Sequence, residues 1–439
     1  MNTEAPVRIR INWGKQLLYK VTCPNCWHRF PPEDMLYVAQ HPDLVGDAVL
    51  GKNDMLRFLP TRFRVSGEAV DPRGASTGEM ACPRCHLPVY EANLEDPPLF
   101  ISLIGSPASG KSYFLATMVH ELRALMPRLR VGFTDAHPAA NSVLNGYEVT
   151  LFRNPQPDRS TEIAKTTTDA VGLHRYAVLE GGVTTRLPVP FQFSLYPLPT
   201  HPNFAEARAK DLRKTMVLYD NAGEDFRPGV EARETTVVHH MATSKILFML
   251  LDLAQEPQFR AVTKSSDPQI RRSLRPKGQQ AALDSQETIL RMASLLLRKY
   301  LGFSESTRLK KPLIVIVPKY DIWEPLVGIS IDKEPYETLR DGRMVMNTAV
   351  VDKASAAIRH LLERYCPQFV AAADALCHKV RFIPVSSLGG SPTYIETPER
   401  AFYGIRPKDI KPKWVTVPLT YCLCKWLPGM IDDRSKGKH

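Results

Sequence analysis

The sequence predicts an α/β protein in which a doubly wound, mostly parallel sheet follows a small cysteine-based N-terminal module. Apolar runs recur along the chain and end at polar loops, as expected for strands that are buried on both faces. A glycine-rich loop joins one of these runs to a helical pattern, and two matched cysteine pairs precede that loop. Together these three observations separate a larger sheet domain from a smaller module.

Length and composition fit an ordinary globular protein of two or three units. The chain has 439 residues, of which 44% are hydrophobic and 23% charged. The N-terminus has no apolar stretch of the kind found in signal peptides. The most apolar window, 246-ILFMLLDL-253, is too short to cross a bilayer. We therefore expect a cytoplasmic protein without a membrane segment.

The N-terminal module contains two C-P-x-C turns, 22-TCPNCWH-28 and 81-ACPRCHL-87. Two thiolates from each turn can complete a tetrahedral sulfur shell, which suits zinc. The predicted ligands are Cys23, Cys26, Cys82 and Cys85, and His28 and His86 are expected to be bystanders. The long separation of the pairs predicts a zinc ribbon with an inserted hairpin or loop, spanning residues 1–97.

Charge is distributed unevenly between the two parts of the chain. Residues 1–97 carry 11 Lys/Arg against 12 Asp/Glu, whereas the whole chain has a formal net charge of +11. A ribbon without basic surplus lacks the usual footprint of nucleic-acid binding, so a structural clip or protein-docking role is favoured. The basic remainder is compatible with phosphate-bearing partners or with a solvated, lysine-rich surface.

The apolar run 99-LFISLIG-105 is followed by a GxxxxGKS loop and a helical pattern. This strand–loop–helix order is the context that a phosphate-binding loop requires. Lys111 is expected to reach the β- and γ-phosphates, and the Ser112 hydroxyl to bind Mg²⁺. The predicted nucleotide-binding residues here are Gly105, Ser106, Pro107, Ala108, Ser109, Gly110, Lys111, Ser112 and Tyr113.

A second motif, 215-TMVLYDNAGEDF-226, places Asp220 at the end of an apolar strand. A carboxylate at this point can hold Mg²⁺, usually through water. Gly223 could present its amide to a γ-phosphate, so this loop would respond to hydrolysis. We assign Lys111, Asp220 and Gly223 to the catalytic set, together with Glu224, which follows Gly223 directly.

A third motif, 313-LIVIVPKYDIW-323, resembles the [NT]-K-x-D segment of P-loop GTPases of the translation-factor-related class. In that family the Asp binds the guanine N1 and N2 groups and the Lys packs over the base, which implies these roles for Asp321 and Lys319. The expected Asn or Thr is replaced by Pro318, which weakens the implied guanine preference. Competing assignments, an ATPase or a nucleotide kinase, leave K-x-D unexplained.

The segment 380-VRFIPVSSLGG-390 lies where the family presents a backbone amide to the guanine O6. The resemblance thus implies base contacts for Ser386, Ser387 and Leu388. The order of the motifs resembles that of the family over residues 98–431. We expect a long switch-region insert at about 129–212, a basic loop insert at about 256–284 and a disordered tail at 432–439.

The γ-phosphate-sensing threonine of the family has no unique counterpart. Candidates are the three consecutive threonines at 166–168 and the pair at 184–185, of which Thr185 is taken as the Mg²⁺ ligand because a strand follows it. Glu224, where many relatives have Gln, implies slow hydrolysis. An arginine finger could come from Arg227, Arg233 or another chain.

The resemblance implies a zinc-bearing GTPase that uses Mg²⁺ and GTP/GDP, as a switch or slow hydrolase. The overall organisation resembles the bacterial double-GTPase branch found in conflict or defence systems, which implies protein partners and a second GTPase. The alternative is a nucleotide-dependent scaffold with little turnover, recruiting partners through the ribbon and the basic insert. An ATPase is a third reading, separable by base competition.

Overall fold

The chain folds into two compact units, and the first is not contiguous in sequence. The computed structural model describes residues 17–163, 173–207, 210–220, 234–263, 267, 285–396 and 401–434. Unit 1 contains Met1–Pro98 and His174–Val189, and unit 2 contains Leu99–Leu173 and Pro190–His439. The segment expected as a switch-region insert at 129–212 therefore contributes to both units.

Unit 1 is built from short antiparallel strands, as its many turn residues require. A four-stranded sheet has the order β10-β9-β3-β6, and the remaining strands form hairpins. The elements are β1 Val21–Thr22, β2 Arg29–Phe30, β3 Leu36–Val38, β4 Val45–Asp47, β5 Gly51–Met55, β6 Arg57–Phe58, β7 Ala69–Val70, β8 Ser76–Thr77, β9 Met80–Ala81, β10 Pro88–Val89 and α1 Glu91–Glu95. Each C-P-x-C turn thus lies between two strands that pair with each other, β1 with β2 and β9 with β10.

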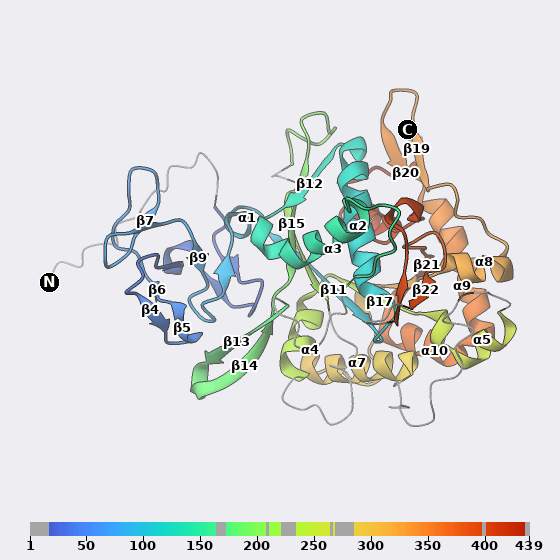
Figure 1. Ribbon diagram of the computed structural model, residues 1–439, viewed down its shortest axis with the longest axis horizontal. Helices are drawn as coiled ribbons and strands as arrows, with labels where there is room; N and C mark the ends of the chain where they lie inside the picture. Colours follow the sequence, from blue (N-terminus) through green and yellow to red (C-terminus); the bar gives the residue numbers. More distant parts are fainter. Residues whose placement is uncertain are drawn as a thin grey trace. The chain divides into compact units, whose positions relative to one another are not determined.

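The hairpin formed by β13 (His174–Leu179) and β14 (Val183–Pro188) completes the core of unit 1 (Figure 1). Ala177 and Leu187 lie on its inner face and belong to the same apolar cluster as the cysteines. The Val178 amide donates to the Val49 carbonyl at 2.8 Å. A segment about 80 residues further along the chain thus supplies part of a small core.

Unit 2 is organised around a seven-stranded mixed, mostly parallel sheet. Its order is β12-β15-β16-β11-β17-β18-β21, so the first strand of the unit lies in the middle. The strands are β12 Val131–Asp135, β15 Phe191–Pro197, β16 Lys214–Asp220, β11 Pro98–Gly105, β17 Ile246–Leu250, β18 Leu309–Val317 and β21 Cys377–Pro384. Strands β11, β17, β18 and β21 are mutually parallel, whereas β15 is antiparallel to both of its neighbours.

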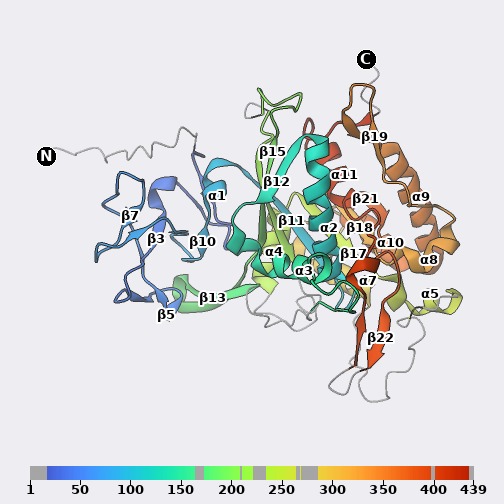
Figure 2. The ribbon, with the colours of Figure 1, turned by 45° about the horizontal axis from the view of Figure 1, so that its top comes forward.

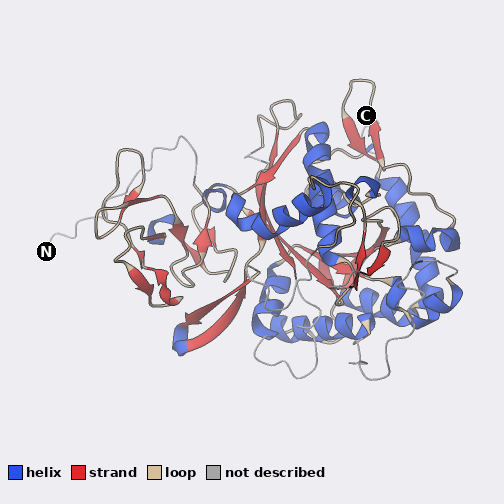
Figure 3. Ribbon diagram, viewed as in Figure 1, coloured by secondary structure: helices blue, strands red, loops and turns tan. Residues whose placement is uncertain are grey.

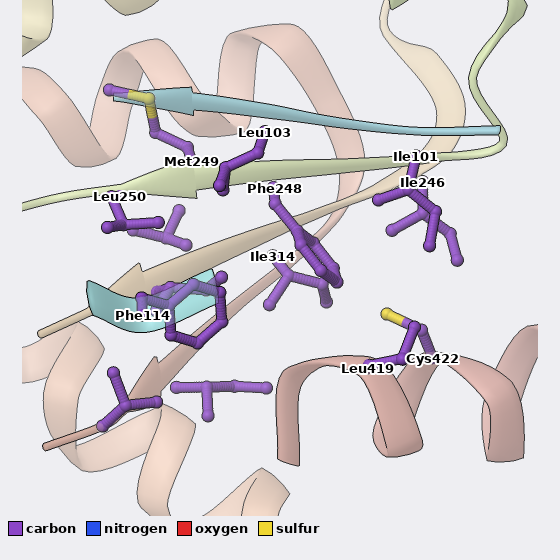
Figure 4. Close-up of a cluster of buried hydrophobic side chains, with 14 of the residues drawn as sticks. Ile101, Leu103, Phe114, Ile246, Phe248, Met249, Leu250, Ile314, Leu419 and Cys422 are labelled. Carbon is purple, nitrogen blue, oxygen red and sulfur yellow. The ribbon is translucent and has the colours of Figure 1, made fainter. Parts of the chain in front are cut away.

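Register explains how one face of this sheet is covered. Ile101 pairs with Ile246 and Leu103 with Phe248, which in turn pairs with Ile314, so these side chains share a face. Figure 4 shows them next to Phe114 of α2 (Lys111–Leu125) and next to Leu419 and Cys422 of α11 (Val417–Trp426). This side is therefore the apolar seam between the sheet and helices α2 and α11.

Helices cover the opposite face as well, which gives the doubly wound architecture visible in Figure 3. Ser102, on the other side of β11, bonds His240 of α4 at 2.8 Å. The other helices are α3 Ser142–Phe152, α4 Glu234–Thr243, α5 Pro257–Val262, α7 Gln286–Leu301, α8 Tyr320–Val327, α9 Thr348–Tyr365 and α10 Pro367–Leu376. In the part of the chain described, no helix is long and apolar enough to cross a membrane.

Two peripheral hairpins project from unit 2. The first pairs β19 (Tyr336–Thr338) with β20 (Met344–Met346), and the second pairs β22 (Thr393–Glu396) with β23 (Ala401–Gly404). Figure 2 shows the second hairpin extending away from the sheet. It follows the predicted base-contacting segment directly in sequence.

Two expectations about irregular segments are wrong at their edges. The segment expected as a basic loop begins with helix α5. This helix packs on the rest of unit 2, because its Phe259 is fully buried and lies edge-on against Tyr365. At the start of the expected disordered tail, the Asp433 carboxylate accepts a 2.7 Å hydrogen bond from the Thr348 hydroxyl and forms a 3.1 Å ion pair with Lys425, so Asp433 is held by contacts. Residues 264–266, 268–284 and 435–439 lie outside the described part of the chain.

Because Leu187 is buried in the core of unit 1, we expect Leu187→Ala to destabilise that unit by about 2–5 kcal/mol. Limited proteolysis should then cleave residues 17–98 faster than in the wild type. Val183→Ala is the matched control, since Val183 lies on the same hairpin but is 63% exposed. Equal protection of both variants would show that the hairpin does not support this core.

Candidate functional site

The predicted ligand-binding loops meet at one edge of the sheet because parallel strands place their carboxyl ends together. Gly105 pairs with Leu250, Leu250 with Ile316, and Val317 with Pro384. The loops that follow these residues begin at the same level of the sheet. Since the strand order reverses at β11, this edge includes the topological switch point where such sheets bind ligands.

The loop between β11 and α2 has the backbone conformation that its glycines permit. Gly110 has φ 92° and caps the N-terminus of α2, and Ala108 also has a positive φ of 59°. A Cβ on Gly105 would lie 3.1 Å from Leu250 Cβ and 3.1 Å from Ser109 Oγ, so a larger residue is disfavoured there. The glycines thus allow a tight loop ending at a helix N-terminus, a geometry suited to anions.

Lys111 and Ser112 lie in the first turn of α2. The Lys111 ammonium donates to the carbonyls of Gly105 at 2.8 Å and Ser106 at 3.1 Å, so it lies over the loop itself. The Tyr113 hydroxyl accepts a 3.1 Å bond from the Ile163 amide and ties the start of the helix to a distant segment. Asp220 ends β16, the neighbour of β11 in the sheet.

The K-x-D loop lies between β18 and α8 and is held by contacts other than the missing Asn. The Trp323 indole donates to the Pro318 carbonyl at 2.9 Å, and the Tyr320 amide donates to the Val385 carbonyl at 3.1 Å. Lys319 adopts a left-handed conformation with φ 58°. Such a conformation is unfavourable for a residue with a side chain, so surrounding contacts must maintain it.

Asp321 and Ser386 come together although 65 residues separate them. The Ser386 hydroxyl donates to Asp321 Oδ1 at 2.5 Å and accepts the Gly389 amide at 3.0 Å. Burial raises the pKa of the Asp321 carboxyl, and the bond from Ser386 partly offsets this. The carboxyl therefore gains its proton at a higher pH than an ordinary Asp, and acidification removes its ability to accept two hydrogen bonds.

The structure adds a residue that the sequence analysis missed. Asp252 is 1% exposed and forms an ion pair with Lys319 at 2.5 Å. Removing one partner of a buried ion pair lowers the free energy of unfolding by about 3–5 kcal/mol. Gln255 and Gln286 also contact Asp252, and both contact Ser106 of the loop between β11 and α2. The signal was available, because 246-ILFMLLDL-253 is an apolar run that ends at Asp, as at Asp220.

The remaining predicted residues differ in where the structure places them. Gly223, Glu224, Arg227 and Arg233, together with the threonines at 166–168, lie outside the described residues. Thr185 lies on β14 in unit 1, where its hydroxyl donates to the Val183 carbonyl at 3.4 Å. Ser387 and Leu388 lie in the loop after β21, and the Leu388 carbonyl accepts the Lys411 amide at 2.9 Å.

The four predicted cysteines of unit 1 form one buried cluster, in which all sulfur atoms lie within 4.8 Å of one another. The Cys23–Cys85 and Cys26–Cys82 sulfur distances are 3.7 and 3.6 Å. A tetrahedron with metal–sulfur bonds of about 2.3 Å has edges of about 3.8 Å, so the spacing fits zinc. Burial raises the pKa of the Cys23 thiol well above its usual value, so a cation beside it would be needed to stabilise its thiolate.

The two C-P-x-C turns repeat the same local geometry. Trp27 and His86, which follow the second cysteine of each turn, have φ 58° and 59°. The amides of Asn25 and Arg84 each point at the first cysteine sulfur at 3.4 Å. His86 bonds the Asp47 carboxylate at 2.8 Å and His28 stacks on Phe30, so both histidines have other partners, as bystanders would.

Comparison with solved structures gives distant structural similarities, among them the following two. One is to the S. cerevisiae Ski7 GTPase-like domain bound to GTP, with a TM-score of 0.26, 14% identity, and coverage of 69% of this chain and 48% of that chain. The other is to the same domain bound to GDP and inorganic phosphate, with a TM-score of 0.27, 14% identity, and coverage of 75% and 51%. This chain spans about half the length of those chains. No protein-family model matches, and no curated protein matches.

If the cysteine cluster holds zinc, Cys26→Ser should lower the zinc content measured by plasma mass spectrometry from about one ion per chain to well below one. It should also lower the unfolding temperature of unit 1. Cys366→Ser is the control, because Cys366 is buried in unit 2 and is not part of the cluster. Unchanged zinc content in Cys26→Ser would rule out this cluster as the site.

Proposed function

We propose that the chain binds GTP with Mg²⁺ at the carboxyl edge of the unit 2 sheet and hydrolyses it slowly, as a switch. Residues 105–113 would hold the phosphates, and Ser112 with Asp220 would hold the ion. Asp321 and Lys319 would contact the base, with Ser386, Ser387 and Leu388 beside it. The cysteine cluster would hold a structural zinc ion in unit 1.

One observation carries this proposal. The phosphate loop lies more than 200 residues before the K-x-D and S-S-L segments. All three nevertheless follow strands whose parallel register brings their ends level. A nucleotide needs phosphate and base contacts on the same side of a scaffold. The hydrogen bond between Asp321 and Ser386 supports this arrangement, since it joins the two segments assigned to the base.

The residues at the phosphate end suit a hard cation with oxygen ligands. Ser112 offers a hydroxyl from the first turn of α2, and Asp220 offers a carboxylate from the strand beside β11. When bound, Mg²⁺ would neutralise charge on the phosphate oxygens during transfer to water. Lys111 would stabilise the same charge from the protein side.

At the base, Asp321 would accept two hydrogen bonds from guanine, and adenine cannot supply them. Calorimetric titration with Mg²⁺ and non-hydrolysable analogues should therefore show tighter binding of GTP than of ATP. Asp321→Ala should weaken GTP binding about 100-fold and leave ATP binding nearly unchanged, since two bonds to a charged acceptor are lost. Lys111→Ala should weaken both nucleotides. Equal binding of ATP and GTP by the wild type would refute guanine selection.

Turnover distinguishes a hydrolase from a scaffold that only binds nucleotide. We expect slow, Mg²⁺-dependent release of phosphate from GTP, reduced at least about 100-fold in Asp220→Ala because the ion loses a ligand. Asp341→Ala is the control, since this carboxylate is exposed and pairs with Arg343 outside the site. Tight GTP binding with no phosphate release above the Asp220→Ala level would instead favour the scaffold.

A further inference from the structure

We propose that Asp252 is a positioning residue that sets base selectivity through Lys319, and that Gln255 couples it to the phosphate loop. This inference rests on the proposed guanine-nucleotide site. Asp252 would not touch the nucleotide. It would hold the Lys319 side chain where its methylene groups can cover the base.

Asp252 is held firmly by its backbone and by one of its carboxylate oxygens. Its amide donates to Gln286 Oε1 at 2.7 Å, and its carbonyl accepts from Gln286 Nε2 at 3.0 Å. Its Oδ1 accepts the Ala254 amide at 3.0 Å and begins the short turn Leu253–Gln255. A carboxylate fixed on its backbone and on one oxygen can fix the position of whatever binds the other oxygen.

The other carboxylate oxygen, Asp252 Oδ2, binds two side chains. It accepts the Lys319 ammonium at 2.5 Å and Gln255 Nε2 at 3.3 Å. The Lys319 side chain is 19% exposed, whereas that of Asp252 is 1% exposed. The buried carboxylate therefore fixes the position of the Lys319 ammonium, while part of the lysine side chain remains accessible to solvent.

Gln255 connects the Asp252–Lys319 ion pair to the proposed phosphate-binding loop. Gln255 Nε2 also donates to the Pro107 carbonyl at 3.1 Å, and Gln255 Oε1 accepts from the Ser106 hydroxyl at 2.9 Å. One side chain therefore contacts the phosphate loop twice and Asp252 once. A shift of the loop that moved Gln255 would also change the surroundings of Asp252 and Lys319, which is how binding energy at one end can bias the other.

The position of Pro318 gives this network its importance. A proline has no side-chain donor or amide hydrogen to steady the loop, and its carbonyl is already bonded by Trp323. Lys319 follows directly, and its ion pair with Asp252 links the K-x-D loop to the strand end at β17. We infer that Asp252 performs the steadying role that the missing Asn or Thr would have had.

A double-mutant cycle tests this assignment in the full-length, zinc-replete chain. Asp252→Asn, Lys319→Met and the double variant are titrated with Mg²⁺ and the non-hydrolysable GTP and ATP analogues. We expect Asp252→Asn to weaken GTP binding at least about tenfold and ATP binding less than about twofold. The double variant should bind GTP no more weakly than Lys319→Met alone, since Asp252 acts through Lys319.

Asp374→Asn is the matched control, because it removes a 2.6 Å Asp–Arg pair near the amino end of β21. It should leave the GTP-to-ATP affinity ratio unchanged. Thermal unfolding of each ligand-free variant reports whether it is folded. If Asp252→Asn is not, Gln255→Ala replaces it, with an expected two- to fivefold loss of the same affinity ratio.

Three results would overturn the inference. Equal weakening of GTP and ATP by Asp252→Asn would mean that Asp252 only supports the fold. Additive effects of Asp252→Asn and Lys319→Met would mean that Asp252 does not act through Lys319, and an unchanged ratio in Gln255→Ala would remove the coupling. A wild type without GTP preference would refute the proposed function itself, a distinct outcome from a selective wild type with insensitive variants.

Discussion

The in-register parallel pairing of β11, β17, β18 and β21 is the constraint on which the candidate site depends. β11 and β17 are buried along nearly their whole length, β18 over its last six residues and β21 over its last three, so these strands are stable only when helices cover both faces. Covering both faces leaves the two edges formed by the strand ends as the places where polar groups can gather. The glycine loop after β11, Asp252, the K-x-D loop and Ser386 all follow strands that end at one of these edges.

The same constraint explains the buried ion pair of Lys319 and Asp252. A charged pair in an apolar setting is costly unless both partners are well bonded. Here the neighbouring strand ends supply Gln255, and the start of α7 supplies Gln286, so the polar groups around Asp252 form a connected network. Networks of this kind are rigid when satisfied, and rigidity would suit the base contacts proposed for the K-x-D loop.

Local patterns in the sequence predicted much of the fold and part of the site. The glycine loop, the apolar strands and the paired cysteines are signals within about ten residues, and the cysteines did form one cluster. The sequence did not reveal that Gln255 and Gln286 join Ser106 to Asp252, because such contacts depend on side chains that no spacing rule brings together. The ordered Asp433 was missed for the same reason, since its partner Thr348 is 85 residues away.

The division of the units shows a further limit of local reasoning. Residues 174–189 lie in sequence between β12 and β15 of the larger sheet, yet Ala177 and Leu187 complete the core around the cysteines. Because β14 ends at Pro188 and β15 begins at Phe191, only two residues separate an element of unit 1 from a strand of unit 2. The core of unit 1 therefore closes a loop of about 80 residues that contains β11, α2 and β12, and contacts of such large sequence separation form slowly. It follows that the core of unit 1 can be completed only after the chain has been made as far as Leu187, beyond the first elements of unit 2.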